Sequence, residues 1–341
     1  MRAASIKDVA THAGVAVGTV SNVLNYPDRV AEKTRQRVLN SINELGFIRN
    51  DVARQLRAGH SRTIGLIVLD IGNPFFTSIS RAAEDAASES GNAVVLGNSG
   101  HDANRERHYI DLFEEQRVQG VLISPVSDIT ERLSALTARG TKVVLVDSPS
   151  SEGDFSSVSV DDVHGGYTAT KHLLDIGRRK IAFVAGPQHF HQVSDRLAGA
   201  RNAVAEFPDA TLEILQGNDL TVLAGREVGD TLVMRQQGEL PDGLFCANDL
   251  LALGMIQSLT MLHTLRIPED VALVGYDDID FAASAVVPLT SISQPTAMIG
   301  RTAIELLAEQ LDNPDAKPRS VVFKPELVVR ASTTEAQSHQ R

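Results

Sequence analysis

Residues 5–25 have the sequence SIKDVATHAGVAVGTVSNVLN, which predicts two short helices joined by a tight turn. Ser5 and Asp8 have the spacing of a capping box, in which each side chain accepts a hydrogen bond from the other residue's backbone N–H. Gly14 stands where the first helix should end, because glycine reaches left-handed backbone angles at little cost. Apolar residues then recur at helical spacing, which predicts a second helix over residues 17–24.

The second helix would present small, uncharged or hydrogen-bonding residues on its outer face, namely Val17, Gly18, Ser21 and Asn22. A helix with such a face beside basic neighbours fits the major groove of DNA. An ordinary helical hairpin that caps a larger domain would have the same pattern. Both interpretations stay open on this stretch alone.

The composition limits the class of protein. A chain of 341 residues, 43% of them apolar, suits two or three domains with sizeable cores. It has no run of about eighteen apolar residues, and its first residues lack the apolar segment of a signal peptide. Cys246 is the single cysteine, so no intrachain disulfide or cysteine-built metal site is possible. We therefore expect a cytoplasmic protein.

The charge is divided unevenly along the chain. The net charge is −11, which alone would argue against a nucleic-acid partner. Residues 1–60, however, contain nine Lys or Arg and five Asp or Glu, a net charge of +4, whereas the remainder contains 23 and 38, a net charge of −15. A basic head on an acidic body lets the head approach phosphates while the body is repelled. This division favours DNA binding.

Two more segments complete the head. Pro27 ends the second helix, and a third helix is predicted from about Glu32 to Leu45, closed by Gly46. Residues 50–57 could form a two-turn helix, which is too short to be stable alone in water. Such a helix can become ordered on binding, and its Leu56 is a side chain of the kind that wedges into the minor groove. A plain linker is the alternative.

From residue 64 onward, short Val, Ile and Leu runs alternate with amphipathic segments. This alternation predicts parallel sheets covered by helices on both faces. About eleven strands are too many for one sheet, so we predict two lobes with a break near residues 161–162. The expected strands are residues 64–69, 93–96, 120–124, 142–146, 157–160, 180–184, 212–215, 243–247, 271–275, 291–293 and 320–331. The expected helices are residues 75–90, 105–117, 164–176, 195–207 and 224–235.

Ligands of such sheets bind at the carboxyl ends of the strands. The residues that follow the predicted strands offer carboxylates, amides, a guanidinium and aromatic rings, which suit a polyhydroxylated small molecule. Of the adjacent Phe75 and Phe76, one should face the core and the other the cleft. Asp249 and Asp278 could instead cap the helices that follow them. His189 and His191 lack a third ligand at a set spacing, so no metal is expected, and no catalytic or nucleotide-binding motif occurs.

The chain resembles the lactose-repressor type (LacI/GalR) family of transcriptional regulators over essentially its full length. The motifs that carry the resemblance lie in both the head and the body. They are Ile6-Lys7-Asp8-Val9-Ala10, Ala13-Gly14-Val15, Thr19-Val20-Ser21, Val23-Leu24-Asn25, Thr34-Arg35, Arg37-Val38, Val52-Ala53-Arg54, Asn73-Pro74-Phe75-Phe76, Asp195-Arg196-Leu197-Ala198-Gly199, Ala247-Asn248-Asp249, Gly275-Tyr276-Asp277-Asp278 and Gln294-Pro295.

The resemblance implies a small all-α helix-turn-helix head and an α/β body with parallel sheets, a two-lobed fold like that of periplasmic binding proteins. It implies the following boundaries: head 1–48; hinge helix and linker 49–62; first lobe 63–161 and 291–322; second lobe 162–290 and 323–333; flexible tail 334–341. It also implies a homodimer on an inverted-repeat operator, not an enzyme. A small effector, most simply a sugar, would close the lobes and shift the hinges. No cofactor is implied.

Functional positions carry over residue by residue. Base contacts would come from Val17, Gly18 and Asn22, with the rest of the DNA-binding set being Ser5, Thr19, Ser21, Asn25, Tyr26, Arg29, Val30, Asn50, Ala53 and Leu56. The effector positions would be Asn73, Phe75, Asp147, Phe190, Gln192, Arg196, Leu220, Asn248, Asp277 and Gln294.

Some residues depart from the family pattern. Ala16 and Ala31 stand where the family commonly has serine, so each helix they precede loses a cap worth about 1 kcal/mol. Gly18 offers no side chain for readout, so the hinge must share the selection of the site. The end of the chain lacks a leucine heptad, so a tetramer is not expected. The alternatives are a purine-type corepressor, or a sugar-binding or sugar-modifying protein without a DNA function.

Overall fold

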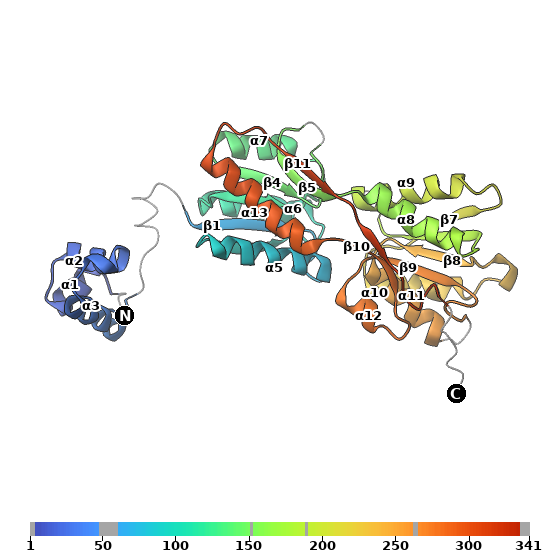
Figure 1. Ribbon diagram of the computed structural model, residues 1–341, viewed down its shortest axis with the longest axis horizontal. Helices are drawn as coiled ribbons and strands as arrows, with labels where there is room; N and C mark the ends of the chain where they lie inside the picture. Colours follow the sequence, from blue (N-terminus) through green and yellow to red (C-terminus); the bar gives the residue numbers. More distant parts are fainter. Residues whose placement is uncertain (1–3, 48–60, 151–152, 188–189, 262–264, 335–341) are drawn as a thin grey trace. The chain divides into compact units, whose positions relative to one another are not determined.

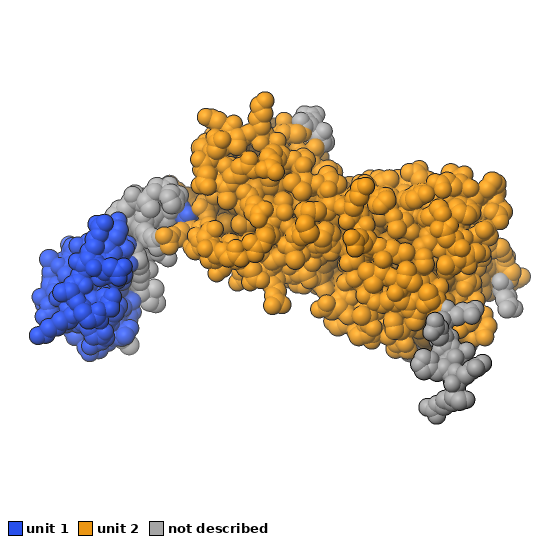
Figure 2. Space-filling model, viewed as in Figure 1, with its two compact units in different colours: residues 1–61 blue, residues 62–341 orange. Residues whose placement is uncertain are grey.

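The computed structural model describes residues 4–47, 61–150, 153–187, 190–261 and 265–334. It divides into two compact units, residues 1–61 and 62–341 (Figure 2). The predicted hinge positions Asn50, Ala53 and Leu56 lie outside the described residues, as does most of the predicted tail.

The first unit contains the three predicted helices. They are α1 (Ile6–Ala13), α2 (Val17–Asn25) and α3 (Glu32–Leu45), with the short 3-10 helix η1 (Pro27–Arg29) between the last two. The capping box is confirmed, because the Ser5 side chain accepts from the Asp8 N–H and Asp8 Oδ2 accepts from the Ser5 N–H at 2.8 Å. Gly14 and Gly46 end their helices in the left-handed region, at φ 61° and 58°. Local sequence therefore sets these boundaries.

A small apolar core joins the three helices. It is formed by Val9, Ala10, Ala13, Val20, Val23 and Val38. Ala16 and Ala31 precede α2 and α3 without any side-chain capping bond, as the sequence predicts. Burial of aliphatic side chains, rather than capping, therefore holds α2 and α3 in place.

The second unit contains two six-stranded sheets, which define a first and a second lobe (Figure 1). The first sheet has the order β11-β5-β4-β3-β1-β2 and the second β12-β10-β9-β8-β6-β7. The strands of the first sheet are β1 (Thr63–Val68), β2 (Ala93–Asn98), β3 (Gly120–Ile123), β4 (Lys142–Val146), β5 (Ser156–Val160) and β11 (Ser320–Phe323). Those of the second are β6 (Lys180–Ala185), β7 (Thr211–Gln216), β8 (Gly243–Cys246), β9 (Ala272–Asp277), β10 (Thr290–Ser293) and β12 (Glu326–Val328).

Helices cover both faces of each sheet. Alternate side chains of β1 enter different cores. Leu66 and Val68 pack with helices α5 (Pro74–Glu89) and α13 (Thr296–Asp312), whereas Ile67 packs with α6 (Ala103–Glu115) and α7 (Thr130–Ala138). In the second lobe, α8 pairs with α9 and α10 pairs with α11 on opposite faces (Figure 1). The helices are α5 (Pro74–Glu89), α6 (Ala103–Glu115), α7 (Thr130–Ala138), α8 (Asp162–Asp175), α9 (His191–Ala205), α10 (Val222–Leu232), α11 (Asp249–Met261), α12 (Asp280–Ser284), α13 (Thr296–Asp312) and the 3-10 helix η2 (Gln237–Glu239).

The chain passes between the two sheets three times: after β5, after β10 and after β11 (Figure 1). Two expectations need correction. The predicted strand 320–331 is two strands, with β11 parallel to β5 in the first sheet and β12 antiparallel to β10 in the second. Strand 290–293, assigned to the first lobe from the sequence, pairs with β9 in the second sheet, because the chain crosses after this strand and not before it.

Among the described residues, no helix is both long and apolar enough to cross a membrane.

Candidate functional site

The outer face of α2 carries the predicted base-contacting positions. Val17, Gly18 and Asn22 are all exposed, and no atom lies within 4 Å of where a Gly18 Cβ would stand. Asn25 donates to the Ser21 carbonyl at 2.8 Å and to Ser21 Oγ at 3.2 Å, so these two side chains brace the last turn of the helix. The structure thus presents an open, uncharged surface on a short helix.

The other predicted DNA-binding positions surround this face less uniformly. Tyr26 and Arg29 are exposed, and the Arg29 guanidinium lies 4.8 Å from the centre of the Tyr26 ring. Thr19 is half-buried. Ser5 is occupied by the capping box, and Val30 packs against the core of the first unit, so each has a structural role beside any contact with DNA.

The predicted effector positions converge on one cavity between the two lobes. Nine of the ten predicted residues line it, and the tenth, Gln294, donates to Asp277 Oδ1 at 2.8 Å. The lining residues are Leu69, Asn73, Phe75, Phe76, His101, Asp147, Phe190, Gln192, Val193, Arg196, Leu220, Asn248 and Asp277. Nine of the positions that the family resemblance implied therefore lie together around one space, at the carboxyl ends of the parallel strands.

Arg196 is the buried cation of this cavity, with 5% of its surface exposed. Its Nε donates to Asp162 Oδ1 at 2.8 Å, and its Nη1 donates to the carbonyl of Ala247 at 2.7 Å and lies 3.8 Å from Asp277 Oδ1. The guanidinium stacks on the Tyr276 ring, 3.6 Å from its centre. Four groups therefore fix its position, and a planar fork of donors suits this arrangement better than an ammonium would.

Two carboxylates that line the cavity sit on strained backbone. Asp147 follows β4 at φ 54° and Asp277 ends β9 at φ 104°, both in the region that side chains other than glycine rarely adopt. Such conformations cost about 1–3 kcal/mol each and persist where the surroundings enforce them, often at functional sites. Here the strain turns both carboxylates toward the space between the lobes.

Burial changes the acidity of these carboxylates. Burial and, to a smaller extent, repulsion from Asp162 raise the pKa of Asp147 to about 8, against the lowering effect of the charge of Arg196. Burial likewise raises the pKa of Asp277 to about 6, against the lowering effect of Arg196 and of the hydrogen bonds from Asn73 and Gln294. Strongly shifted carboxylates in a cavity are typical of a ligand site.

Direct hydrogen bonds join the lobes across the cavity. Asn73 of the first lobe donates to Asp277 Oδ2 of the second at 3.2 Å, and Gln192 of the second donates to the carbonyl and Oδ2 of Asp147 at 3.2 and 2.9 Å. The volume of this cavity is about 40 Å³, enough for a few waters. A ligand of sugar size therefore enters only when the lobes separate.

The sequence analysis missed several residues of this site. Asp162 pairs with Arg196, and the His101 ring lies 4.5 Å from the Phe190 ring at a tilt of 42°, yet neither residue was predicted. Both follow strand ends, so the rule used for the other positions could have found them. Phe75 and Phe76 both line the cavity, which corrects the expectation that one of them would face only the core.

Asp249 and Asp278 have structural roles, but they do not cap the helices that follow them, which was the alternative given by the sequence. Asp249 accepts from Ser291 Oγ at 2.7 Å and from the Ile279 N–H at 2.9 Å, and Asp278 pairs with Arg330 at 2.7 Å. Within the described residues, no group of three or more His, Cys, Asp or Glu side chains is arranged to hold a metal ion.

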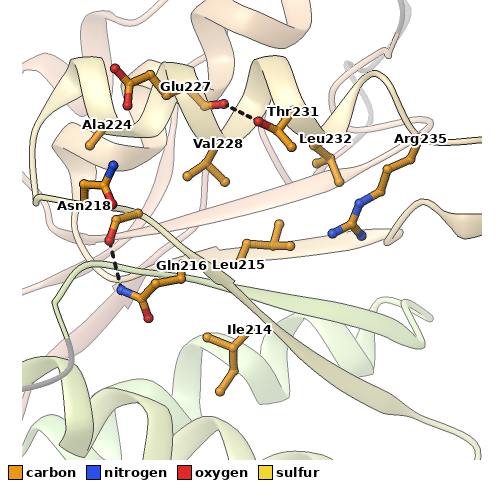
Figure 3. Close-up of a pocket in the computed structure, with 11 residues that line it drawn as sticks. Ile214, Leu215, Gln216, Asn218, Ala224, Glu227, Val228, Thr231, Leu232 and Arg235 are labelled. Carbon is orange, nitrogen blue, oxygen red and sulfur yellow. Dashed lines mark hydrogen bonds between the residues drawn. The ribbon is translucent and has the colours of Figure 1, made fainter.

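A larger pocket, with a volume of about 370 Å³, opens between β7 and α10 (Figure 3). Aliphatic side chains such as Ile214, Val228 and Leu232 line much of it. Its cation, Arg235, already pairs with Glu213 at 2.9 Å, and Thr231 donates to the Glu227 carbonyl. These polar groups are engaged with one another and do not converge on the pocket, so the interlobe cavity is the better effector site.

Comparisons with known proteins support both parts of the chain. Residues 5–50 match the family described as bacterial regulatory proteins, lacI family, and residues 170–333 match a periplasmic binding protein-like domain. The HTH-type transcriptional repressor PurR of Aliivibrio fischeri is 35% identical over 340 residues, which are 96% of this chain and 98% of the relative. The repressor of the same name from Vibrio vulnificus is 36% identical over 337 residues, which are 96% of this chain and 98% of that relative.

Solved structures agree with these matches. The lac repressor dimer bound to operator and the anti-inducer ONPF has a TM-score of 0.83 and 27% identity, and the match covers 98% of this chain and 100% of that one. The complex of the transcriptional regulator CelR with cellobiose has a TM-score of 0.71 and 31% identity, covering 96% of this chain and 99% of that one.

Proposed function

The chain belongs to the lacI family of bacterial regulatory proteins, and we propose that it is a cytoplasmic repressor that binds an inverted-repeat operator as a homodimer. A small effector held between the lobes would set its operator affinity. The observation that carries this proposal is the convergence of Arg196, Asp147 and Asp277 on a closed cavity, in a chain whose first unit presents an exposed, uncharged helix face.

On the DNA, α2 would enter the major groove with Val17, Gly18 and Asn22 against the bases. Tyr26 and Arg29 would lie near the backbone phosphates. Because Gly18 has no side chain, few direct base contacts are available from α2. Selectivity would depend in part on how the two heads are spaced along the operator.

The effector is proposed to be a sugar. Carboxylates, an arginine and two amides bond vicinal hydroxyls well, and phenylalanine rings pack on the C–H face of a sugar ring. The CelR structure holds cellobiose, and another LacI family regulator, from Enterococcus faecium, holds ribose at 28% identity. These relatives support a sugar in the cavity without naming one.

A second candidate is a purine that tightens operator binding. The repressors named PurR from Aliivibrio fischeri and Vibrio vulnificus match 96% of this chain at 35% and 36% identity. The rings of Phe75 and Phe190 in the cavity also suit a flat heterocycle. The direction of the change in operator affinity separates the two candidates. A sugar would lower the affinity for the operator, and a purine would raise it.

The test begins with selection of an operator from random duplexes by the full chain. Fluorescence anisotropy then measures operator affinity with and without each member of a panel of sugars and purines. We expect nanomolar affinity for a palindromic site and a change of tenfold or more with one member. Absence of any sequence preference would contradict the proposal.

The hinge supplies a separate prediction. Leu56→Ala is expected to weaken operator binding by at least tenfold, because the wedge that stabilises the bent DNA would be lost. Thermal stability and effector affinity should stay within error of the wild type, since residues 62–341 form their own compact unit. Wild-type operator affinity in the variant would rule out the wedge.

A further inference from the structure

We propose that the effector is uncharged or carries an amine, and that the cavity rejects phosphorylated and carboxylated molecules. This inference rests on the proposed function, since it concerns the same cavity. The ligand class is a hydroxyl-rich or amine-bearing ring compound that offers hydrogen-bond donors to Asp147. The chemical reason is an excess of buried carboxylates over buried cations around the space between the lobes.

The one fixed cation of the cavity is already neutralised. Among the described residues that line it, Arg196 alone is a lysine or arginine. Its Nε donates to Asp162 Oδ1 at 2.8 Å, and both side chains are 6% exposed. Arg196 is therefore shared between Asp162 and Asp277, whose Oδ1 lies 3.8 Å from its Nη1, and among the described lining residues no lysine or arginine remains for Asp147. The N-termini of α5 and α9 offset about half a charge each, which still leaves the cavity negative.

Asp147 is the carboxylate best placed to receive a ligand donor. Its Oδ2 accepts from Gln192 at 2.9 Å, whereas its Oδ1 is buried and has no hydrogen-bond partner. A buried acceptor without a partner is unfavourable unless something bonds it. A ligand hydroxyl can satisfy this oxygen in either protonation state of Asp147, as a donor to the carboxylate or as an acceptor from the carboxylic acid. A phosphate or carboxylate would instead add a negative charge to a cavity that already holds Asp162 and Asp277.

The groups around Asp147 are mostly acidic. Those that face it come from α8 with the residue before it, from α9, from the end of β9 and from the turn after β2. They are Asp161, Asp162, His191, Asp195, Arg196, Asp277 and His101. Burial lowers the pKa of His191, so this imidazole is not a ready source of positive charge near neutral pH.

The acidity of Asp147 agrees with this charge balance. Burial and repulsion from Asp162 raise its pKa to about 8, far above the ordinary value of an aspartate. Near neutral pH the closed cavity thus holds a proton on Asp147 in preference to a third carboxylate charge. A cavity that neutralises one of its own acids will not admit an anion, whereas an ammonium group could replace the proton.

The first experiment needs no ligand. A folded pKa above the unfolded value means that the folded state binds more protons, so stability falls as pH rises from about 4 to 8. Melting temperatures of the full chain are measured from pH 5 to 9 for the wild type, Asp147→Asn and the exposed control Asp85→Asn. We expect the melting temperature of Asp147→Asn relative to wild type to increase steadily with pH, and that of the control to stay level. A pH-independent difference for Asp147→Asn would overturn the inference.

The second experiment compares matched ligands by thermal shift and calorimetry at pH 7.5. The uncharged or amine-bearing probes are ribose, adenosine and glucosamine; their anionic counterparts are ribose 5-phosphate, adenosine monophosphate and glucosamine 6-phosphate. We expect the binding members to come from the first group, each at least tenfold tighter than its phosphorylated counterpart. A phosphorylated probe that binds more tightly than its parent would refute the inference.

Operator binding by the same preparation separates the two possible failures. If the chain binds its operator normally but the cavity binds the phosphorylated probes more tightly than their parents, only the charge inference is contradicted. A chain that selects no operator would contradict the proposed function, while the pH dependence of Asp147→Asn would still test the cavity.

Discussion

The carboxylate of Asp277 joins three parts of the chain at one point. It accepts from Asn73 of the first lobe and from Gln294 at a crossing between the lobes, and it lies 3.8 Å from the guanidinium of Arg196. Its backbone is held at φ 104° to do so. Each carboxylate oxygen accepts a hydrogen bond from a different segment. In an isosteric amide, an NH2 group would replace one of these oxygens, and this donor would then face the donor of Asn73 or of Gln294.

Asp277→Asn is therefore expected to weaken effector binding by tenfold or more, since charge-assisted hydrogen bonds contribute about 1.5–3 kcal/mol. Calorimetric titration with the effector found in the operator screen measures the loss. Operator affinity without effector should persist, and the exposed neighbour Asp280→Asn should behave as the wild type. Equal effector affinity in wild type and Asp277→Asn would place the ligand elsewhere.

At the scale of elements, the contact between α8 and α9 positions the arginine. The two helices approach so closely that a Cβ on Gly199 would lie 2.0 Å from the Val163 carbonyl oxygen, and one on Gly166 would lie 2.1 Å from the Arg196 carbonyl oxygen. The first helix carries Asp162 and the second carries Arg196, so the spacing of the helices sets the ion pair. Glycines remote from the ligand thereby control the cavity.

Gly199→Ala should lower the melting temperature of the full chain, because the added methyl meets backbone atoms that cannot move aside; overpacking of this kind costs roughly 1–3 kcal/mol. Effector affinity should fall with it, as α9 is pushed from α8. Gly238→Ala is the control in the same lobe, since nothing lies within 4 Å of its Cβ position. A variant as stable as the wild type would show that the helices can separate freely.

At the scale of the whole molecule, three crossings connect the two lobes, and side-chain hydrogen bonds close them. Crossings at one edge allow the lobes to rotate while each sheet keeps its own core. The charge distribution acts at the same scale. The basic first 60 residues and the acidic remainder favour approach to DNA through the head alone.

Operator affinity should consequently fall steeply with salt. If about four phosphates are contacted, the affinity falls roughly 100-fold between 50 and 200 mM salt, because bound counterions are released from the DNA. Anisotropy titrations at several salt concentrations give the slope. Effector binding to the buried cavity, measured in the same buffers, should change far less. An operator affinity that does not vary with salt would contradict the charge argument.

The sequence by itself determined the features that depend on near neighbours in the chain. Helix ends in the first unit follow from Ser5, Gly14 and Gly46, whose hydrogen bonds and backbone angles are local. The parallel strands follow from short apolar runs that must be covered on both faces. Nine positions that the family resemblance implied line one cavity. Most of them follow strands, and the carboxyl ends of parallel strands meet at one edge whatever the order of the strands.

Tertiary structure alone decided which distant groups meet. The Asp162–Arg196 pair, the partner of β10 and the division of residues 320–331 between two sheets each depend on pairings that no local pattern encodes. A strand's own sequence gives its exposure but not its neighbour, and a carboxylate's own sequence gives neither its burial nor its charge partner. For that reason the charge balance of the cavity, which selects the ligand, depends on the contact between the two lobes and cannot be derived from the sequence of either one.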